Sequence, residues 1–308
     1  MRLEEKQLSQ LVDMGNPQRV MDEVKTIVFM MFPEFDFEAV NSVFRDVVSL
    51  FRGQYPGYRK CNTAFHDIRH TIDTMLDMSR LIHGAMVNRQ DFSEKNVALG
   101  LITALFHDTG FIQTIDDNVG TGSKYTLTHI SRSIEFMDKY FTEKGYSRED
   151  VEYCSAILKC TGLGVKMNDI HFLSLENEML GKMLGTADLL SQMADRIYLE
   201  KLPFLYREFK EGNVEGFESE LDLLKKTPGF FNMSLERFEH DLGGVNKYMR
   251  DHFRVRWGID KDLDITTIEN NIKYLNYVLE NHQDDYRKHL RRGVLAKKLD
   301  EIRGEAGS

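Results

Sequence analysis

The chain has 308 residues, of which 42% are hydrophobic, 29% charged and 11% aromatic, and it contains only 5 prolines. This composition is typical of a folded globular protein and excludes a disordered or collagen-like chain. The formal net charge of -9 at pH 7 argues against a nonspecific grip on nucleic-acid phosphates, so we expect no nucleic-acid partner.

Apolar residues recur at helical spacing along almost the whole chain, first from Val20 to Met31. No convincing alternation of the kind typical of strands interrupts this pattern, so the sequence predicts an all-α fold. Pro33 follows the first strong helix, and a capping box from Ser147 to Asp150 opens another. In chain order, the predicted helices cover residues 17–32, 36–52, 64–83, 94–108, 126–144, 148–160, 175–210, 213–226, 232–255 and 262–290.

The Gly-rich breaks between these helices are too short to be flexible linkers between domains. We therefore expect a helical extension over residues 1–35, one domain over residues 36–290, and a basic helix end and tail over residues 291–308. Basic side chains gather between Arg287 and Lys298. We interpret them as a solvated helix end, because the bulky apolar face of a membrane helix is missing, with a partner-binding or anionic-lipid face as the alternative.

The N-terminal sequence mixes charged and apolar residues and lacks the apolar core of a signal peptide. The longest apolar run elsewhere is too short for a membrane span. The cysteines Cys61, Cys154 and Cys160 have neither CxxC spacing nor the dense pairing of a secreted disulfide scaffold. We therefore expect a cytoplasmic protein with reduced thiols and no membrane span.

Histidines and aspartates occur together in two segments. The segment FHDIRH places His66 and His70 four residues apart, which is one helical turn, and Asp73 follows on the same face. Two imidazoles on one helical face can point into one cavity. The sequence therefore predicts that this face contributes to a polar site.

The second pair, His107 and Asp108, ends the run VALGLITALFHD, which is too apolar for a surface helix. An ionised aspartate at such a core boundary is costly unless a cation compensates its charge. Asp188 lies in another apolar segment, MLGKMLGTADLLSQM, and we expect it to point inward as well. Its rival Asp195 forms, with Arg196, a pair that is typical of a helix surface.

Four side chains from these segments would supply two nitrogens and two or more oxygens to a metal ion: His70, His107, Asp108 and Asp188. This donor set suits Mn, Fe, Zn, Ni or Mg, and the sequence does not choose among them. A bound ion activates water and neutralises phosphoryl oxygens in the transition state. The predicted chemistry is therefore hydrolysis of a phosphoester.

Three further residues receive expected roles around this ion. A histidine ordinarily titrates near neutrality, so we assign His66 as the general acid that protonates the leaving oxygen. Asp73 is expected to hold an imidazole tautomer through a hydrogen bond. Lys124 lies in the segment GTGSK, which lacks the spacing of a Walker loop. It is a candidate contact to a substrate phosphate, with an ordinary surface lysine as the alternative.

The order of FHDIRH, ALFHD, LTHISRSIEFM and LGTADLL resembles the HD superfamily of metal-dependent phosphohydrolases, and within it the catalytic domain of class I cyclic nucleotide phosphodiesterases. The resemblance covers roughly residues 60–200. It implies an HD-domain, phosphodiesterase-like helical bundle over residues 36–290. It also implies a phosphoric ester hydrolase with one or two divalent ions, acting on a nucleotide, including a cyclic one, or on another small phosphoester.

The resemblance also implies roles for individual residues. His66 corresponds to the family's proton donor, and Asp73 lies behind the ligands. The implied metal ligands are His70, His107, Asp108 and Asp188, with His129 as a ligand near the second metal. Two positions depart from the family's pattern, because Phe111 and Cys160 stand where histidines are expected.

Two other functions stay open. An HD-fold diiron oxygenase would use similar ligands, and iron content with oxygen uptake would identify it. A catalytically inactive signalling or binding module would keep the helical fold and bind no metal tightly. For the enzyme, the expected partner is a small-molecule phosphoester, and a homo-oligomer is an open possibility.

Overall fold

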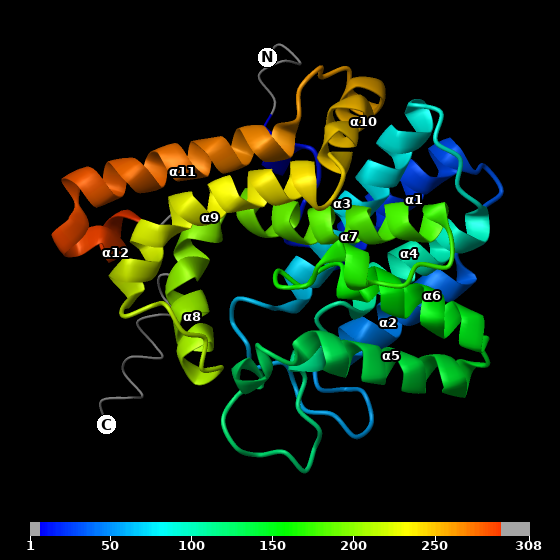
Figure 1. The fold of residues 1–308 in the computed structure, drawn as a ribbon, viewed down its shortest axis with the longest axis horizontal. Helices are drawn as coiled ribbons and strands as arrows, with labels where there is room; N and C mark the ends of the chain where they lie inside the picture. Colours follow the sequence, from blue (N-terminus) through cyan, green and yellow to red (C-terminus); the bar gives the residue numbers. More distant parts are fainter. Residues whose placement is uncertain (1–6, 291–308) are drawn as a thin grey trace.

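The computed structural model describes residues 7–290. In this range the chain forms α-helices and short 3-10 helices and no strand; an isolated bridge pairs Tyr58 with Thr114. The predicted all-α fold is confirmed. The helices pack as a bundle, and α7 (Leu175–Ala194) lies in its middle (Figure 1).

The remaining α-helices, in chain order, are α1 (Pro17–Met31), α2 (Glu38–Phe51), α3 (Ile68–Val87), α4 (Glu94–Phe106), α5 (His129–Lys144), α6 (Arg148–Lys159), α8 (Tyr198–Glu211), α9 (Glu220–His240), α10 (Tyr248–Trp257), α11 (Leu263–Asn281) and α12 (Tyr286–His289). The short 3-10 helices are η2 (Leu8–Gln10), η3 (Thr109–Phe111), η4 (Gly122–Tyr125), η5 (Met167–Asp169), η6 (Val245–Lys247) and η7 (Gln283–Asp285). The predicted capping box of Ser147 and Asp150 is present and opens α6.

Two long helices that the periodicity predicts are interrupted. Residues 175–210 form α7 and α8, because the carboxylate of Asp195 accepts a hydrogen bond from the backbone N–H of Ile197 at 3.0 Å. Such an aspartate turn competes with the helical hydrogen bonds. Residues 262–290 form α11, η7 and α12. Apolar periodicity continues across these breaks, which is why it did not reveal them.

The predicted helices over 213–226 and 232–255 also have different bounds. α9 continues through Pro228, so the expected gap between the two segments is wrong. The break comes later, at Gly243 and Gly244, which both have positive φ. Glycine adopts this left-handed conformation without a steric penalty, so these two residues turn the chain between α9 and α10.

The N-terminal helix α1 packs against α3. Its side chains Val20, Val24 and Ile27 are wholly buried and belong to the same hydrophobic core as the central helices. The expected extension over residues 1–35 therefore shares this core from its first described residues onward. The boundaries at 36 and 290 stay predictions, and the expected basic tail over 291–308 lies outside the described residues.

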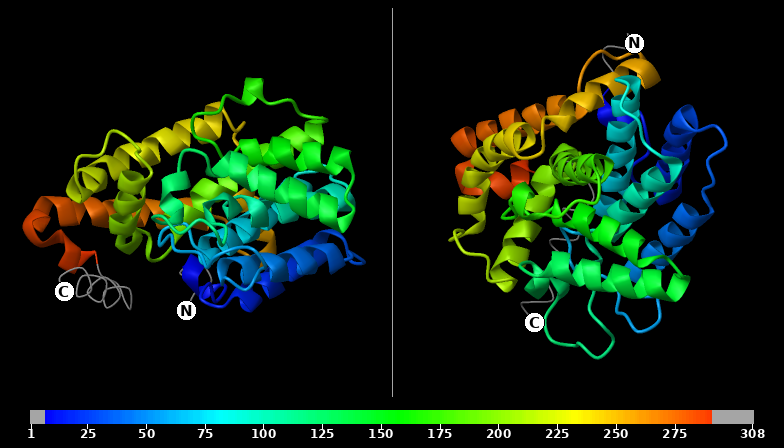
Figure 2. Two further views of the ribbon diagram at one scale, coloured as in Figure 1. Left: turned by 90° about the horizontal axis from the view of Figure 1, so that it is seen from below. Right: turned by 45° about the vertical axis from the view of Figure 1, so that its right-hand side comes forward.

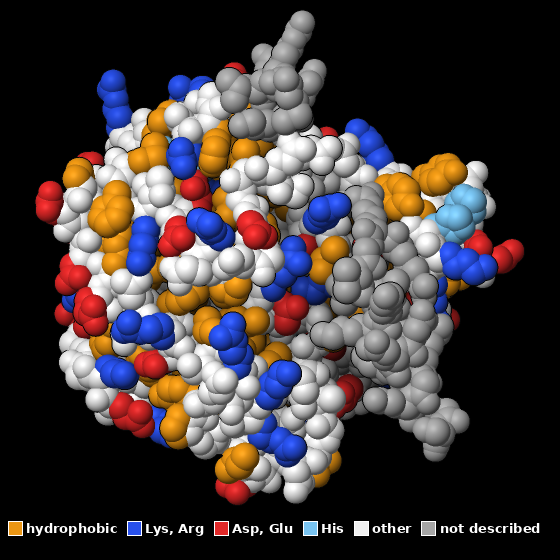
Figure 3. Space-filling model, turned by 180° about the vertical axis from the view of Figure 1, so that it is seen from behind, with side chains coloured by type: hydrophobic (Ala, Val, Ile, Leu, Met, Phe, Trp, Pro, Cys, Tyr) orange, Lys and Arg blue, Asp and Glu red, His pale blue; other side chains and the backbone are white. Residues whose placement is uncertain are grey.

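The bundle places α8, α9, α11 and α12 on one side of α7, and α2, α4, α5 and α6 on the other (Figures 1 and 2). The central helix contacts α3, α4, α6 and α11. On the face opposite that of Figure 1, Lys and Arg side chains are interspersed with Asp and Glu (Figure 3). Over residues 7–290, none of the helices combines the length and the apolar composition that crossing a bilayer requires.

The crossing of α3 and α10 gives a test of the packing. A side chain at Gly84 would collide with the backbone carbonyl of Tyr248. Gly84→Ala should therefore lower the free energy of unfolding in urea by about 1–3 kcal/mol. The control is Gly229→Ala in α9, where a Cβ meets no atom within 4 Å. Alanine there should stabilise the helix by up to about 1 kcal/mol. Equal effects of the two substitutions would contradict this packing.

Candidate metal centre

Three helices bring the four predicted ligands together. His70 lies in the first turn of α3, and Asp188 lies in the second half of α7. His107 and Asp108 follow directly after α4. Because α3 packs against both α4 and α7, the four side chains meet at one buried point.

The nitrogen and oxygen atoms of these side chains lie within coordination range of one another. The Nε2 atom of His70 is 3.2 Å from Nε2 of His107 and 3.0 Å from Oδ1 of Asp188. Oδ2 of Asp108 lies 3.5 Å from Nε2 of His70 and 3.3 Å from Nε2 of His107. Ligand atoms about 2.1 Å from a shared ion are about 3.0–3.4 Å apart at octahedral or tetrahedral angles. The spacing of His70, His107 and Asp108 is therefore close to that of donors around a single ion. Asp188 approaches the two imidazoles, at 3.0 Å and 3.6 Å, but lies outside the group whose ligand atoms are all within 4.8 Å of one another.

Two further observations show that these residues fit a divalent cation. The Nδ1 atom of His107 donates a hydrogen bond to the carbonyl of Ala104 at 2.8 Å. Because a carbonyl only accepts, the neutral ring carries its proton on Nδ1 and directs the Nε2 lone pair at the cluster. Oδ2 of Asp108 is buried and accepts no hydrogen bond from any residue between 7 and 290. Such an oxygen is costly unless a cation or a donor compensates it.

The opposite charges in the cluster shift one another's pKa values toward the ionised forms. Burial raises the pKa of Asp108, but the imidazoles of His107, His66 and His70 outweigh it and leave the pKa well below its usual range. Burial lowers the pKa of His107, and the carboxylates of Asp108 and Asp188 outweigh it and raise the pKa to about 9. The metal-free cluster therefore keeps a proton on an imidazole near neutral pH, and a bound cation must displace that proton.

His66 reaches the site from outside the helix. α3 begins at Ile68, because the carboxylate of Asp67 caps the helix by accepting the N–H of His70 at 3.0 Å. The prediction that His66 and His70 share a helical face is therefore wrong. The two rings nevertheless lie near each other, with centroids 6.1 Å apart.

A glutamate that the sequence analysis missed orients His66. Nδ1 of His66 donates to Oε2 of Glu208 at 2.7 Å, and the other oxygen of Glu208 accepts the N–H of Phe65 at 2.7 Å. Burial lowers the pKa of His66, but the hydrogen bond and the charge of Glu208 outweigh it and raise the pKa. Glu208 follows the buried Leu205 by three residues and lies on the same buried face of α8. An acidic residue at this position of an apolar helical face was the sequence signal that could have identified it.

Phe111 fills the position between His66 and His129. Its ring stacks on both imidazoles, with centroid distances of 4.5 Å to His66 and 4.6 Å to His129. Nδ1 of His129 donates to the carbonyl of Thr126 at 2.7 Å. The compact group whose ligand atoms all lie within 4.8 Å of one another contains His70, His107 and Asp108. The role of His129 as a second-metal ligand stays a prediction.

Asp73 and Lys124 make other contacts than those we expected. Oδ2 of Asp73 lies 3.9 Å from Nε of Arg69, and its Oδ1 accepts no hydrogen bond within the described part of the chain. The expected hydrogen bond from Asp73 to an imidazole is therefore not formed. The amine of Lys124 pairs with Asp117 at 2.5 Å and with the carbonyl of Val119 at 2.6 Å. Its expected contact with a substrate phosphate stays a prediction.

Asp195 differs from its expected surroundings, whereas Cys160 is a free thiol as expected. The side chain of Asp195 is only 7% exposed and lies 3.5 Å from Arg69 and 3.9 Å from Lys201. Its assignment to a helix surface is wrong, because the turn after α7 directs it inward. Cys160 is wholly buried, and burial raises the pKa of its thiol to about 12. A neutral thiol is a poor replacement for a histidine ligand.

Hydrogen bonds connect the two helices that carry His70 and Asp188. The hydroxyl of Thr74 lies 2.9 Å from that of Ser191, which joins α3 to α7. The hydroxyl of Thr74 also lies 3.0 Å from the carbonyl of His70, and that of Ser191 lies 3.1 Å from the carbonyl of Asp188. The hydroxyl that accepts the hydrogen bond between the helices donates its own proton to the carbonyl. These contacts restrict the positions of both ligand-bearing turns.

The fold and the site together define an all-α protein with a buried candidate centre of two histidines and two aspartates. A family model described as Npun_R2479-like matches residues 115–242. This segment contains Asp188 and Glu208 but not His70, His107 or Asp108. Comparisons with curated proteins and with solved structures found no match. The geometry of the site therefore carries the functional argument.

Metal affinity should depend on pH, because His107 has a pKa of about 9 without an ion. Below this pKa a cation competes with a proton for the imidazole of His107. The affinity for Zn²⁺ should therefore fall by about tenfold for each unit by which the pH is lowered. Isothermal titration calorimetry between pH 6 and 8 measures this slope and the proton released. The exposed His171 provides the control His171→Ala, which should keep the wild-type slope. A pH-independent affinity would contradict the arrangement.

Proposed function

We propose that the protein is a metal-dependent phosphohydrolase that hydrolyses a phosphoester of a nucleotide or of another small molecule. The observation that supports this most directly is the convergence of two imidazole nitrogens and two carboxylates on one buried point. The order of the motifs, which resembles that of the HD superfamily, points to the same chemistry. Cyclic nucleotides are one candidate substrate within this class.

The four side chains would hold the cation: His70, His107, Asp108 and Asp188. When bound, a divalent cation supplies an electrophile that activates water and neutralises charge on phosphoryl oxygens. The side chain of Asp188 is 18% exposed, whereas those of His70 and His107 are 4% and 1% exposed. We therefore expect the phosphoryl group to approach on the side of Asp188.

His66 and Glu208 are suited to deliver a proton. Glu208 accepts a hydrogen bond from Nδ1–H of His66 and raises the pKa of the ring. The imidazole therefore stays protonated to a higher pH than an ordinary histidine does. Its Nε2–H is then the proton that can pass to the leaving oxygen. Stacking on Phe111 fixes the plane of the ring. Glu208 acts in this scheme as a positioning residue.

The proposal predicts that Asp108→Ala loses bound metal and turnover together. Loss of a residue that only orients a metal ligand typically costs up to about 100-fold in activity. Asp108 supplies an oxygen to the cluster itself, so its loss should lower kcat/KM by more than about 100-fold. Elemental analysis beside a panel of phosphoester substrates measures both quantities. The control Asp138→Ala removes an exposed carboxylate on α5 that pairs with Arg148.

The control should retain metal and activity. An Asp108→Ala variant that hydrolyses the substrate without bound metal would refute the proposal. Wild-type protein that contains iron and takes up oxygen, but cleaves no phosphoester, would instead identify an oxygenase. Folded wild-type protein that binds no metal would identify an inactive module.

A second prediction concerns the pH dependence of turnover. A general acid works in its protonated form, so activity should fall as the pH rises through the pKa of His66. Glu208 raises that pKa. In Glu208→Gln the alkaline limb of the kcat profile should move to lower pH, and kcat should fall by up to the roughly 10²–10⁴-fold value of a general acid.

The pH profile distinguishes this role from a structural one. The control Glu178→Gln removes a half-buried carboxylate that pairs with Lys182 on α7, and it should leave the alkaline limb in place. An unshifted alkaline limb in a folded Glu208→Gln protein would contradict the assignment of His66.

A further inference from the structure

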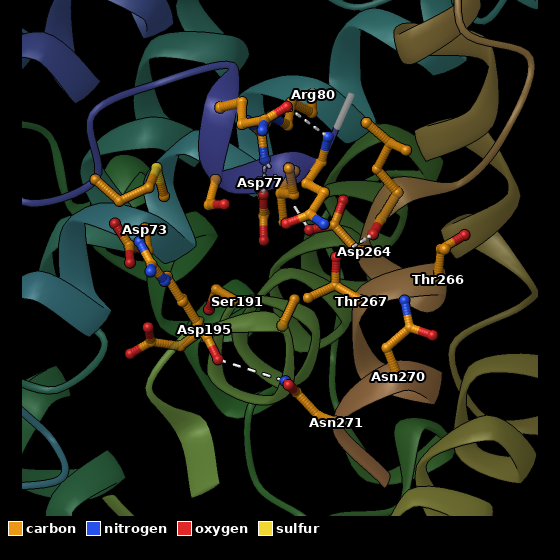
Figure 4. A pocket seen from close by; sticks show the side chains of 18 of the residues that line it. Asp73, Asp77, Arg80, Ser191, Asp195, Asp264, Thr266, Thr267, Asn270 and Asn271 are labelled. Atoms are coloured by element: carbon orange, nitrogen blue, oxygen red, sulfur yellow. Dashed lines mark hydrogen bonds and ion pairs between the residues drawn. The ribbon is translucent and has the colours of Figure 1, made fainter. Parts of the chain in front are cut away.

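Two groups of polar and charged side chains lie outside the candidate metal centre. The first lines a cavity of about 940 Å³ between the segment around η2 and helices α3, α7 and α11. Figure 4 shows Asp73, Asp77 and Asp264 around this cavity. The charged residues that line it are five acids and four bases, and Arg80 pairs with Asp77 at 2.8 Å. This nearly balanced lining favours no single class of charged ligand.

The second group lies at the C-terminal end of α11, where the chain turns into α12 (Figure 1). Besides the group in the candidate metal centre, the described residues contain one further set of three metal-ligating side chains whose ligand atoms all lie within 4.8 Å of one another. It consists of His282, Asp285 and His289. These residues follow one another by three and four positions, and the turn brings them together.

The three side chains contact one another. Nε2 of His289 lies 3.4 Å from Oδ1 of Asp285, which is close to the spacing of about 3.0–3.4 Å between ligand atoms of a shared ion. The rings of His282 and His289 stack, with centroids 3.7 Å apart and planes inclined by 14°. Because the lone pairs lie in the ring planes, one imidazole has to turn before both nitrogens face the same ion. The side chain of His289 is 33% exposed, which leaves room for this turn.

Contacts outside the group hold the backbone that carries it. The hydroxyl of Tyr274 donates to the carbonyl of His289 at 2.7 Å, which ties α12 to α11. The carboxylate of Glu220 accepts hydrogen bonds from Tyr286 at 2.9 Å and from Nε of Arg287 at 2.6 Å, which ties α12 to α9. Binding of an ion therefore requires a side-chain movement and little ordering of the backbone, which lowers its entropic cost.

The contacts that compete with an ion are weak. Oδ2 of Asp285 lies 3.4 Å from Nζ of Lys288, whose side chain is 76% exposed, and such an exposed ion pair contributes little to stability. Nε2 of His282 lies 3.4 Å from the hydroxyl of Tyr277, which is a long hydrogen bond. His282 is also the residue that ends α11, and the partial negative charge at a helix C-terminus favours a cation there.

We propose that His282, Asp285 and His289 bind a zinc ion, which links α12 to the end of α11. Two imidazole nitrogens and a carboxylate oxygen suit Zn²⁺, whereas Mg²⁺ prefers oxygen ligands alone. The fourth position of a tetrahedral zinc ion remains for water. The site shares no residue with the candidate metal centre, and it does not depend on the proposed phosphohydrolase activity.

Elemental analysis and calorimetric titration of the full-length protein with Zn²⁺ test this proposal. His282→Ala and His289→Ala should each weaken zinc binding at this site by more than about tenfold, the smallest loss typical of residues that only support a ligand. Both side chains are half-buried at the surface, so the variants should fold, and circular dichroism checks this. The control His240→Ala changes an exposed histidine in the last turn of α9 and should bind Zn²⁺ as the wild type does.

The variant Asp108→Ala separates this ion from one in the candidate metal centre. The zinc ion at His282 should remain in Asp108→Ala, and it should be lost when His282→Ala is added.

Hydrogen exchange of the wild-type protein gives a readout that needs no variant. Zn²⁺ should slow the exchange of backbone amides over residues 283–290, because the ion links this turn to α11. Mg²⁺ should not slow it. Zinc affinity that is unchanged in His282→Ala, or amide exchange over 283–290 that Zn²⁺ does not slow, would each overturn the proposal.

Discussion

The structure depends on the way three packed helices deliver charged and polar side chains to one point in the core. His70, His107, Asp108 and Asp188 meet where α3 crosses α7 beside the end of α4. Buried carboxylates and imidazoles are stable there only because each compensates the other, or because a cation compensates the carboxylates. Burial of the apolar faces of these helices provides free energy that offsets the cost of burying such a cluster.

Helix α3 carries both the candidate metal centre and the wall of the large cavity. His70 belongs to the first, and Asp73 and Asp77 belong to the second, one and two turns further along. A small cavity of about 10 Å³, which has room for about one water, lies between them and is lined by His70, Asp73 and Ser191. The metal centre and the large cavity are therefore neighbours that share one helix but use different residues.

The sequence predicted the parts of this account that local patterns encode. Apolar periodicity gave the all-α fold, and the capping box at Ser147 gave the start of α6. His107, Asp108 and Asp188 were identifiable as candidate ligands because they stand in or at the end of apolar runs, and His70 was identifiable from its four-residue spacing to His66. Their convergence agrees with that interpretation, because buried polar groups need partners.

Contacts between distant segments were not predictable in the same way. Glu208 reaches His66 across 142 positions of the chain, and no local pattern predicts that pairing. Asp195 looked exposed beside Arg196, but the turn that it forms after α7 directs its own carboxylate inward. His66 has helical spacing from His70, and the cap at Asp67 nevertheless places it outside the helix.

X-ray diffraction from crystals grown with excess Mn²⁺, recorded with anomalous scattering, tests the central claim most directly. The account predicts an anomalous peak about 2.0–2.3 Å from Nε2 of His70 and of His107 and from one oxygen each of Asp108 and Asp188. Crystals that show no peak at this point, with the four side chains turned toward separate partners, would contradict it.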